Sequence, residues 1–242
     1  RDSSTSRGLG DVYKRQNESC SPTGSEELTM PVILPGQTDI YALTDARLSC
    51  GRTLETVVSA LLGAGVKIIQ YREKHMKSGE MLEECRLMRL LTLEAGACFI
   101  VDDHVDLAIL AEADGVHIGQ EDFPLPAVRQ LVGPKMCIGL STHSPEQAKA
   151  AVAVGADYIG VGPIFATKTK EDVVAPVGFD YLDWVAANIS IPFVAIGGIK
   201  EHNITDVAWH GARCCALVSE LVGAPDIAAK VQAVRAAMQR GM

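Results

Sequence analysis

The chain has 242 residues, of which 48% are hydrophobic and 21% are charged, and its formal net charge is -8. This globular composition with an acidic balance argues against a nucleic-acid surface, which needs clustered Lys and Arg, but it permits small phosphorylated ligands. No apolar run approaches the roughly 18 residues that indicate a membrane span, so no membrane partner is expected.

Residues 1–29 differ in composition from everything that follows. They are rich in Ser, Gly and charged residues, show no hydrophobic periodicity, and lack the apolar core of a signal peptide. We predict that this segment is disordered and non-native, resembling read-through of a cloning adapter, with Met30 as the native start. A natural disordered tail is the alternative.

Eight short β-rich runs follow from residue 38 onward. They are apolar almost throughout instead of alternating, which is typical of parallel strands buried on both faces. The predicted strands are 39–45, 66–73, 97–103, 115–119, 136–142, 158–164, 192–198 and 214–220.

Amphipathic stretches between these runs predict helices, most clearly at 53–65, 78–96 and 144–156. The last begins with Ser144 as N-cap, Pro145 at the first helical position and Gln147 completing a capping box. Several helices end in a joint of the kind "LGAGV" or "EADGV", where a left-handed residue is expected to turn the chain into the next strand.

Eight such units predict a single (β/α)8 TIM barrel over residues 38–240. A doubly wound open sheet is the competing fold. It would often carry a glycine fingerprint after its first strand, and "YALTDARLSCG" contains none.

The seven cysteines are spread along the chain without a C-x-x-C pair. Their odd number and apolar neighbours predict buried free thiols in a reducing, cytoplasmic compartment. A homo-oligomer is compatible with the sequence, which does not determine the oligomeric state.

Polar residues gather where the predicted strands end, the edge that carries the chemistry in such barrels. Period two places Gln70, Arg72 and Lys74 on one side of the second strand, where two cations suit a di-anion. Asp103 and Asp122 follow neighbouring strands and could share a divalent cation. Together they suggest a metal-chelated diphosphate.

A second anion site is predicted after strands seven and eight. Gly197, Gly198 and Ser219 occupy the positions where barrels commonly bind a phosphate monoester through backbone N–H groups. The mouth is therefore expected to hold two phosphorylated ligands, one of them with a metal.

Each signal also has a purely structural interpretation. The cluster at 72–74 could be an ion-pair network, and Asp103 could cap the following helix. His117 lies within an apolar run and is expected to be a core histidine. His143, at a strand end, is open to either interpretation.

Motifs at nearly every strand end resemble those of the thiamine phosphate synthase family. They include "YALTD", "IIQYREK", "VDDHVDLA", "GVHIGQED", "GLSTHS", "GPIFATKTK", "IPFVAIGGI" and "LVSE", in the family's order over about residues 38–235. This combination is much more specific than a likeness of fold.

The resemblance implies a magnesium-dependent transferase of thiamine biosynthesis. It would join 4-amino-5-hydroxymethyl-2-methylpyrimidine diphosphate to 4-methyl-5-(2-phosphoethyl)thiazole, or its carboxylated form, and release diphosphate. Mg²⁺ would be the cofactor, held by Asp103 and Asp122. The implied catalytic residues are Arg72, Lys74, Ser141 and Lys170.

The resemblance also implies two sets of substrate contacts. The pyrimidine diphosphate would be bound by Gln70, Tyr71, Arg72, Glu73, Lys74, Asp102, Ser141 and Lys170. The thiazole phosphate would be bound by Thr167, Lys168, Thr169, Gly198, Val218 and Ser219.

The chain departs from the family at Asp102, where Asn is frequent. An ionised Asp cannot donate the hydrogen bond that an Asn can. Two rival functions remain: a thiazole tautomerase on the same fold, which binds only the thiazole phosphate and could use His143, and a non-catalytic phosphate-binding barrel.

Overall fold

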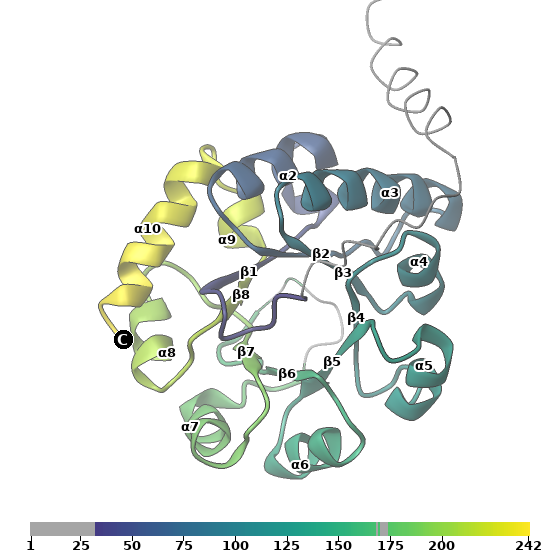
Figure 1. Ribbon diagram of the computed structural model, residues 1–242. Helices are drawn as coiled ribbons and strands as arrows, with labels where there is room; N and C mark the ends of the chain where they lie inside the picture. Colours follow the sequence, from purple (N-terminus) through teal and green to yellow (C-terminus); the bar gives the residue numbers. More distant parts are fainter. Residues whose placement is uncertain (1–31, 168, 170–173) are drawn as a thin grey trace, which may run out of the picture. The chain divides into compact units, whose positions relative to one another are not determined.

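A closed barrel of eight parallel strands organises the chain. The computed structural model describes residues 32–167, 169 and 174–242. Each strand is hydrogen-bonded to the next in chain order, and β8 pairs with β1 to close the ring, which Figure 1 shows surrounded by helices. The predicted (β/α)8 barrel is confirmed, and the open sheet is wrong. The strands are β1 Ile40–Leu43, β2 Ile68–Tyr71, β3 Cys98–Asp102, β4 Gly115–Ile118, β5 Cys137–Thr142, β6 Tyr158–Val161, β7 Phe193–Ala195 and β8 Cys215–Leu217.

Helices connect the strands and cover the outside of the ring. In α6, Ser144 caps the N-terminus as predicted, but the Gln147 side chain accepts from the N–H of His143 and not from that of Ser144. The capping box is therefore displaced by one residue. The helices are η1 Ala46–Leu48, α2 Leu54–Gly63, α3 Ser78–Glu94, α4 Val105–Leu110, α5 Leu125–Val132, α6 Pro145–Ala153, α7 Gly178–Asn188, α8 Ile204–Trp209, α9 Ser219–Val222 and α10 Ile227–Gln239.

Most of the strands end earlier than the sequence predicts. After β2, the N–H of Arg72 donates to the hydroxyl of Thr44 at 3.0 Å and no longer to a strand carbonyl. After β7, Gly197 and Gly198 have φ values of 100° and 64°, outside the β region. The polar and glycine residues that looked like strand ends are therefore loop residues, which frees them for the barrel mouth.

The joints from helix to strand adopt the expected left-handed conformation. Gly65, Gly96, Gly155 and Gly211 all have positive φ. In "EADGV" the residue with positive φ is Glu112, at 52°, and not the glycine. In this joint a residue with a side chain therefore adopts the left-handed backbone conformation that glycine adopts in the other four.

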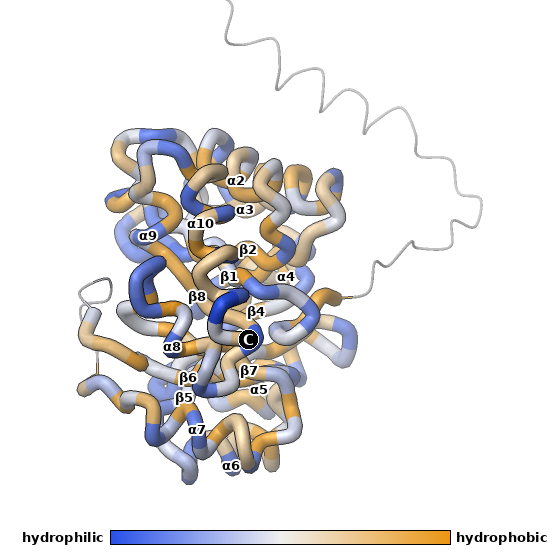
Figure 2. The backbone as a smooth tube through the Cα atoms, turned by 90° about the vertical axis from the view of Figure 1, so that its left-hand side faces the viewer, coloured by the Kyte–Doolittle hydropathy of each residue, from blue (hydrophilic) through white to orange (hydrophobic). Residues whose placement is uncertain are grey.

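Strand side chains divide into two packing layers. Those facing outward join the helices in the main core, and the helices alternate between hydrophobic and hydrophilic colours along their turns (Figure 2). Those facing inward, including Tyr41 and Tyr158, form a separate cluster inside the ring. Val32, Ile33 and Leu34 pack against this inner cluster, and Figure 1 shows their segment crossing near the barrel axis. Since they cover the end where the strands begin, the opposite end is left for a site.

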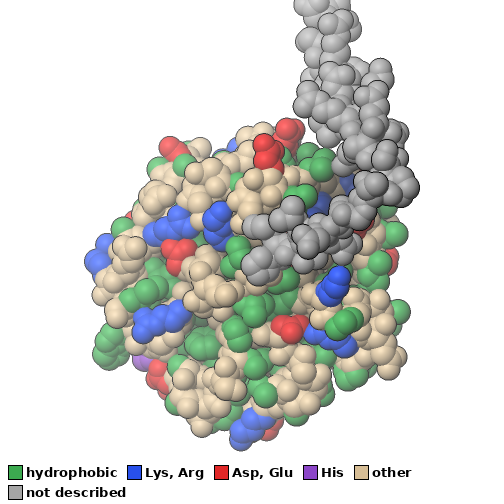
Figure 3. Space-filling model, in the orientation of Figure 1, with side chains coloured by type: hydrophobic (Ala, Val, Ile, Leu, Met, Phe, Trp, Pro, Cys, Tyr) green, Lys and Arg blue, Asp and Glu red, His purple; other side chains and the backbone are tan. Residues whose placement is uncertain are grey.

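The surface charges, the helix lengths and the burial of the cysteines can be compared with the predictions from the sequence. Acidic and basic side chains are interspersed over the face in Figure 3. Among the described residues, no helix is long and apolar enough to cross a membrane. The described cysteines are free thiols, of which five are buried as predicted, while Cys50 is exposed.

A repeated ion pair ties the start of one strand to the preceding helix. The Asp114 carboxylate accepts from the N–H of Phe99 and from Arg89 of α3, both at 2.8 Å. Asp157 repeats the pattern with the N–H of Ile138 and with Arg129 of α5. Each aspartate therefore joins two neighbouring strands and one helix.

We predict that Asp114→Ala lowers the free energy of unfolding by about 1–3 kcal/mol, because it leaves the partly buried Arg89 and the N–H of Phe99 without their acceptor. The matched control is Asp106→Ala, on the exposed face of α4, where the loss should stay below about 0.5 kcal/mol. Urea unfolding of the full chain measures both. Equal losses in the two variants would contradict the prediction.

Candidate functional site

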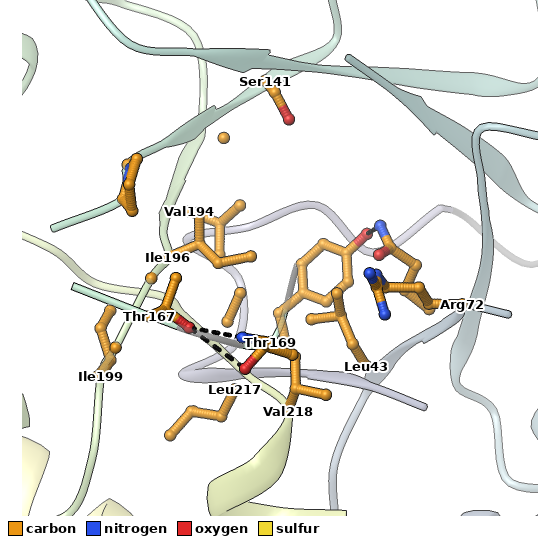
Figure 4. Close-up of a pocket in the computed structure, with 18 of the residues that line it drawn as sticks. Leu43, Arg72, Ser141, Thr167, Thr169, Val194, Ile196, Ile199, Leu217 and Val218 are labelled. Atoms are coloured by element: carbon orange, nitrogen blue, oxygen red, sulfur yellow. Dashed lines mark hydrogen bonds between the residues drawn. The ribbon is translucent and has the colours of Figure 1, made fainter. Parts of the chain in front are cut away.

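One large cavity opens at the carboxyl ends of the strands. Its volume is about 1220 Å³, and residues from the loops after all eight strands line it. Pockets for a single small ligand are typically about 300–1,000 Å³, so this space can hold two. Figure 4 shows Arg72, Ser141, Thr167 and Val218 reaching it from different elements.

Asp103 holds an unusual backbone conformation at the cavity edge. Its φ is 60°, rare for a residue other than glycine, and its N–H donates to the carbonyl of His117 at 2.8 Å. The N-cap of α4 is His104, without a side-chain capping bond. Asp103 therefore does not cap the helix and faces the cavity, so the structural alternative for this residue is wrong.

Asp122 lies beside Asp103 and completes an acidic pair. Its carboxylate accepts from the N–H of Gly119 at 2.6 Å. Burial raises the pKa of Asp122, and the nearby Asp103 carboxylate raises it further, against the opposing effect of the Gly119 hydrogen bond. Two like charges are thus held together, an arrangement that a divalent cation would relieve.

The acidic pair fits Mg²⁺ in number and in chemistry. Mg²⁺ is usually held by one or two carboxylates, several waters and substrate phosphates, and not by a cage of protein ligands. Within residues 32–167, 169 and 174–242, no group of three or more His, Cys, Asp or Glu could hold a metal by itself. A cation at Asp103 and Asp122 would therefore need further oxygen ligands from water or a bound phosphate.

Arg72 and Lys74 balance the neighbouring carboxylates. Arg72 donates to Asp45 at 3.0 Å and lies 3.7 Å from Asp102. The ammonium of Lys74 lies 2.8 Å from Asp102 and contacts Asp103 closely. Burial lowers the pKa of Lys74, but these two carboxylates outweigh it and the pKa is raised. Burial and Asp103 raise the pKa of Asp102 despite both cations.

The structure brings part of the predicted pyrimidine-diphosphate set to the cavity. The members that line it are Gln70, Arg72, Asp102 and Ser141.

The side chains of the other described members lie elsewhere. Tyr71 points outward and donates to Glu84 of α3 at 2.7 Å, as its alternate position on β2 requires. Glu73 accepts from the N–H groups of Lys74 and His75. Because β2 ends at Tyr71, Lys74 does not continue the inward face and reaches the site only through its ammonium. Lys170, like Lys168, lies outside the described residues.

The described residues of the set predicted to bind the thiazole phosphate all line the cavity: Thr167, Thr169, Gly198, Val218 and Ser219. The hydroxyls of Thr167 and Thr169 are 3.2 Å apart and hydrogen-bonded, as Figure 4 shows. A Cβ on Gly198 would lie 2.7 Å from the carbonyl oxygen of Ala166. Only glycine fits this close approach and its positive φ.

Lys200 is a cavity residue that the sequence did not single out. Its ammonium donates to the Ser219 hydroxyl at 3.1 Å and pairs with Glu220 at 3.2 Å. Lys200 is two residues beyond Gly198, and a cation so close to a predicted phosphate site could have been noticed in the sequence. Lys200 therefore adds a cation to the predicted phosphate side of the cavity.

Three histidines, His117, His143 and His202, also line the cavity. His117 lies in the barrel interior, where its ring is 3.0 Å from the Tyr158 hydroxyl and 2.9 Å from that of Ser141, but it also reaches the cavity, which its interpretation as a core residue did not include. His143 bonds the carbonyl of Gly162 at 2.5 Å. A histidine in an apolar run gives no sequence signal for such a position.

Comparison with known proteins shows the family of this chain. A family model described as thiamine monophosphate synthase matches residues 40–221. The chain belongs to this family. It is 58% identical over 212 residues to a thiamine-phosphate synthase of Lawsonia intracellularis, covering 86% of this chain and 98% of that one. It is 60% identical over 204 residues to a thiamine-phosphate synthase of Pelotomaculum thermopropionicum, covering 84% and 94%.

Solved structures show the same relationship. A thiamine phosphate pyrophosphorylase from Pyrococcus furiosus superposes with a TM-score of 0.75 at 35% identity, over 84% of this chain and 96% of that one. A 3-hexulose-6-phosphate synthase superposes with a TM-score of 0.61 at 17% identity, over 83% and 100%, which shows the shared fold alone.

We predict that Lys200→Met weakens the binding of inorganic phosphate about tenfold or more, because a charge-assisted donor contributes about 1.5–3 kcal/mol. Lys149→Met, an exposed lysine on α6 that contacts Trp184, is the matched control and should leave binding unchanged. Calorimetric titration with phosphate measures both. Unchanged affinity in Lys200→Met would contradict the prediction.

Proposed function

We propose that the chain condenses 4-amino-5-hydroxymethyl-2-methylpyrimidine diphosphate with 4-methyl-5-(2-phosphoethyl)thiazole, or its carboxylated form, to give thiamine phosphate and diphosphate. Membership of the family supports this transferase activity in thiamine biosynthesis. The observation that carries the proposal is the two-sided cavity. One side combines carboxylates with Arg72 and Lys74, and the other combines Gly198 with Ser219 and Lys200.

Under this proposal the acidic side holds the diphosphate substrate. Arg72 and Ser141 contact the pyrimidine diphosphate, while Asp103 and Asp122 hold Mg²⁺. Once bound there, Mg²⁺ supplies charge neutralisation for the diphosphate oxygens. Lys170 is assigned to the same substrate by resemblance.

The opposite side holds the second substrate. Thr167, Thr169, Gly198, Val218 and Ser219 bind the thiazole phosphate, and Lys168 is assigned there by resemblance. The hydroxyls, the glycine backbone and Lys200 offer donors that suit a phosphate monoester.

The reaction requires one bond to break and one to form. The bond between the pyrimidine methylene carbon and the diphosphate oxygen breaks, and its electron pair leaves with diphosphate. The lone pair of the thiazole nitrogen then forms the new carbon–nitrogen bond. For the uncarboxylated thiazole no proton moves, so the protein needs to position the reactants and stabilise the leaving charge but needs no nucleophile or general base. The carboxylated form would in addition lose its carboxylate as carbon dioxide and take up a proton from water at the same carbon. Arg72 and Lys74 stabilise the negative charge of the leaving diphosphate.

The acidic pair weighs against the alternative functions. A thiazole tautomerase binds only the thiazole phosphate and has no use for Asp103 and Asp122 facing the cavity. A non-catalytic barrel would not need carboxylates held together against their repulsion, with Asp103 in a strained backbone. The free thiols support a reducing, cytoplasmic setting. A homo-oligomer stays a prediction.

The deciding experiment mixes the protein with both phosphorylated substrates and Mg²⁺ and measures thiamine phosphate by chromatography. We expect product, and we expect excess EDTA to abolish it. Absence of product, with isomerisation of the carboxylated thiazole instead, would move the assignment to the tautomerase. Full turnover in EDTA would retain the transferase and remove Mg²⁺ from it.

We predict that substitutions on the two sides affect different substrates. Lys74→Ala leaves Asp102 and Asp103 less compensated, so it should raise the KM for the pyrimidine diphosphate and lower kcat, tenfold to hundredfold overall, about 1.5–3 kcal/mol. Ser219→Ala should raise only the KM for the thiazole phosphate, about tenfold or less, because that phosphate keeps its charge throughout. Steady-state kinetics with each substrate varied measures both. An effect of Lys74→Ala confined to the thiazole phosphate would contradict the allocation.

A further inference from the structure

A continuous chain of hydrogen bonds crosses the floor of the cavity. The Gln70 amide nitrogen donates to the Tyr41 hydroxyl at 2.9 Å, and this hydroxyl lies 2.9 Å from that of Tyr158. The Tyr158 hydroxyl lies 3.0 Å from Nδ1 of His117. Nε2 of His117 lies 2.9 Å from Oγ of Ser141. Five side chains from five strands are thus linked in one line.

The barrel interior is shaped to hold this chain. Tyr41 and Tyr158 are 2% and 1% exposed, so their hydroxyls depend on protein partners. Gly139 leaves the space: a Cβ there would lie 2.2 Å from the Tyr158 ring and 2.4 Å from Nδ1 of His117. Both ends of the chain, Gln70 and Ser141, line the cavity.

The chemistry of each group sets the direction of the hydrogen bonds. An amide nitrogen only donates, so Tyr41 accepts from Gln70 and turns its own proton to Tyr158. Tyr158 in turn donates to His117.

A neutral histidine that accepts at Nδ1 carries its proton on Nε2. His117 therefore donates from Nε2 to Ser141, whose own O–H is left to donate into the cavity. At the other end, no hydrogen bond among the described residues uses the carbonyl oxygen of the Gln70 side chain, which is left as an acceptor.

The donor and acceptor roles of Gln70 and Ser141, at the two ends of this hydrogen-bond chain, are consequently linked. Reversal would require the Gln70 amide, both tyrosine hydroxyls and the His117 tautomer to change together, since a partial change either sets two donors against each other or leaves a buried tyrosine O–H without an acceptor. The hydrogen-bond chain thus presents to the cavity either an acceptor at Gln70 and a donor at Ser141, or a donor at Gln70 and an acceptor at Ser141.

We propose that Tyr41, Tyr158 and His117 are positioning residues that fix this polarity and thereby select the aminopyrimidine ring. The inference rests on the proposed function. An exocyclic amino group donates, as the Gln70 carbonyl requires, while a ring nitrogen or a diphosphate oxygen accepts from Ser141. An analogue with oxygen in place of the amino group sets an acceptor against the Gln70 carbonyl and is rejected.

The test compares two ligands by calorimetry: the pyrimidine diphosphate and its analogue with oxygen in place of the amino group. Wild-type protein should prefer the amino compound at least about 100-fold, as expected of a site built around a hydrogen bond. Tyr158→Phe interrupts the chain at its centre and should reduce that preference at least tenfold. An unchanged preference in Tyr158→Phe would overturn the proposal.

Tyr181→Phe is the matched control. It removes another buried hydroxyl, which donates to Thr142 at 2.7 Å outside this hydrogen-bond chain, and should keep the wild-type preference. A loss of preference in Tyr181→Phe equal to that in Tyr158→Phe would also overturn the proposal.

A second measurement needs no variant that might unfold. Nitrogen-15 NMR of the wild-type chain, with the His117 signal assigned by its absence in His117→Gln, reports which ring nitrogen carries the proton. A proton on Nε2 alone supports the proposal, whereas a proton on Nδ1 or on both nitrogens overturns it. Failure of the wild type to make thiamine phosphate would instead refute the proposed function, which the product assay detects separately.

Discussion

The repulsion among three carboxylates at the edge of the cavity is the constraint that shapes this site. Burial raises the pKa of Asp102 and of Asp122, and the nearby Asp103 carboxylate raises both further. Arg72 and Lys74 offset part of this charge, so they are engaged before any substrate arrives. A diphosphate approaching alone would meet carboxylates as well as cations, and the net attraction would be small. Positive charge that enters with the substrate resolves the conflict, which is why a divalent cation suits this edge.

The backbone contributes to the same constraint. Along β3 the side chains alternate, so Asp102 faces the barrel interior and a regular continuation would turn Asp103 toward the helices. The positive φ of Asp103 returns its side chain to the cavity. A strained conformation of this kind costs of order 1–3 kcal/mol, and the hydrogen bond from its N–H to His117 helps to hold it. The acidic pair therefore exists because the loop departs from strand geometry.

Prediction from the sequence succeeded where periodicity and position carry the information. Buried parallel strands predict a barrel, and a barrel places its strand ends together, so Arg72, Ser141 and Ser219 could be found without coordinates. Prediction of the site failed where the direction of a side chain depends on the residue at which the strand ends. Lys74 follows β2 by three residues, and alternation no longer applies to it. The cavity position of His117 was not predicted, because its partners, Ser141 and Tyr158, are distant in sequence and only the pairing of β4, β5 and β6 brings them together.

The hydrogen-bond chain at the floor of the cavity and the charged side chains at its rim have different roles. Under the proposed function, bound phosphates would lie at the rim of the cavity with the cations, the metal and water, whereas a charge buried at its floor would be costly to desolvate. The hydrogen-bond chain gives the floor polarity without charge. Under the proposed function this matters for the reaction as well as for selection. As diphosphate departs, the ring donates electrons to the methylene carbon and its amino group becomes more positive. The acceptor at Gln70 then binds the transition state more strongly than the substrate, and such differential binding is what accelerates a reaction.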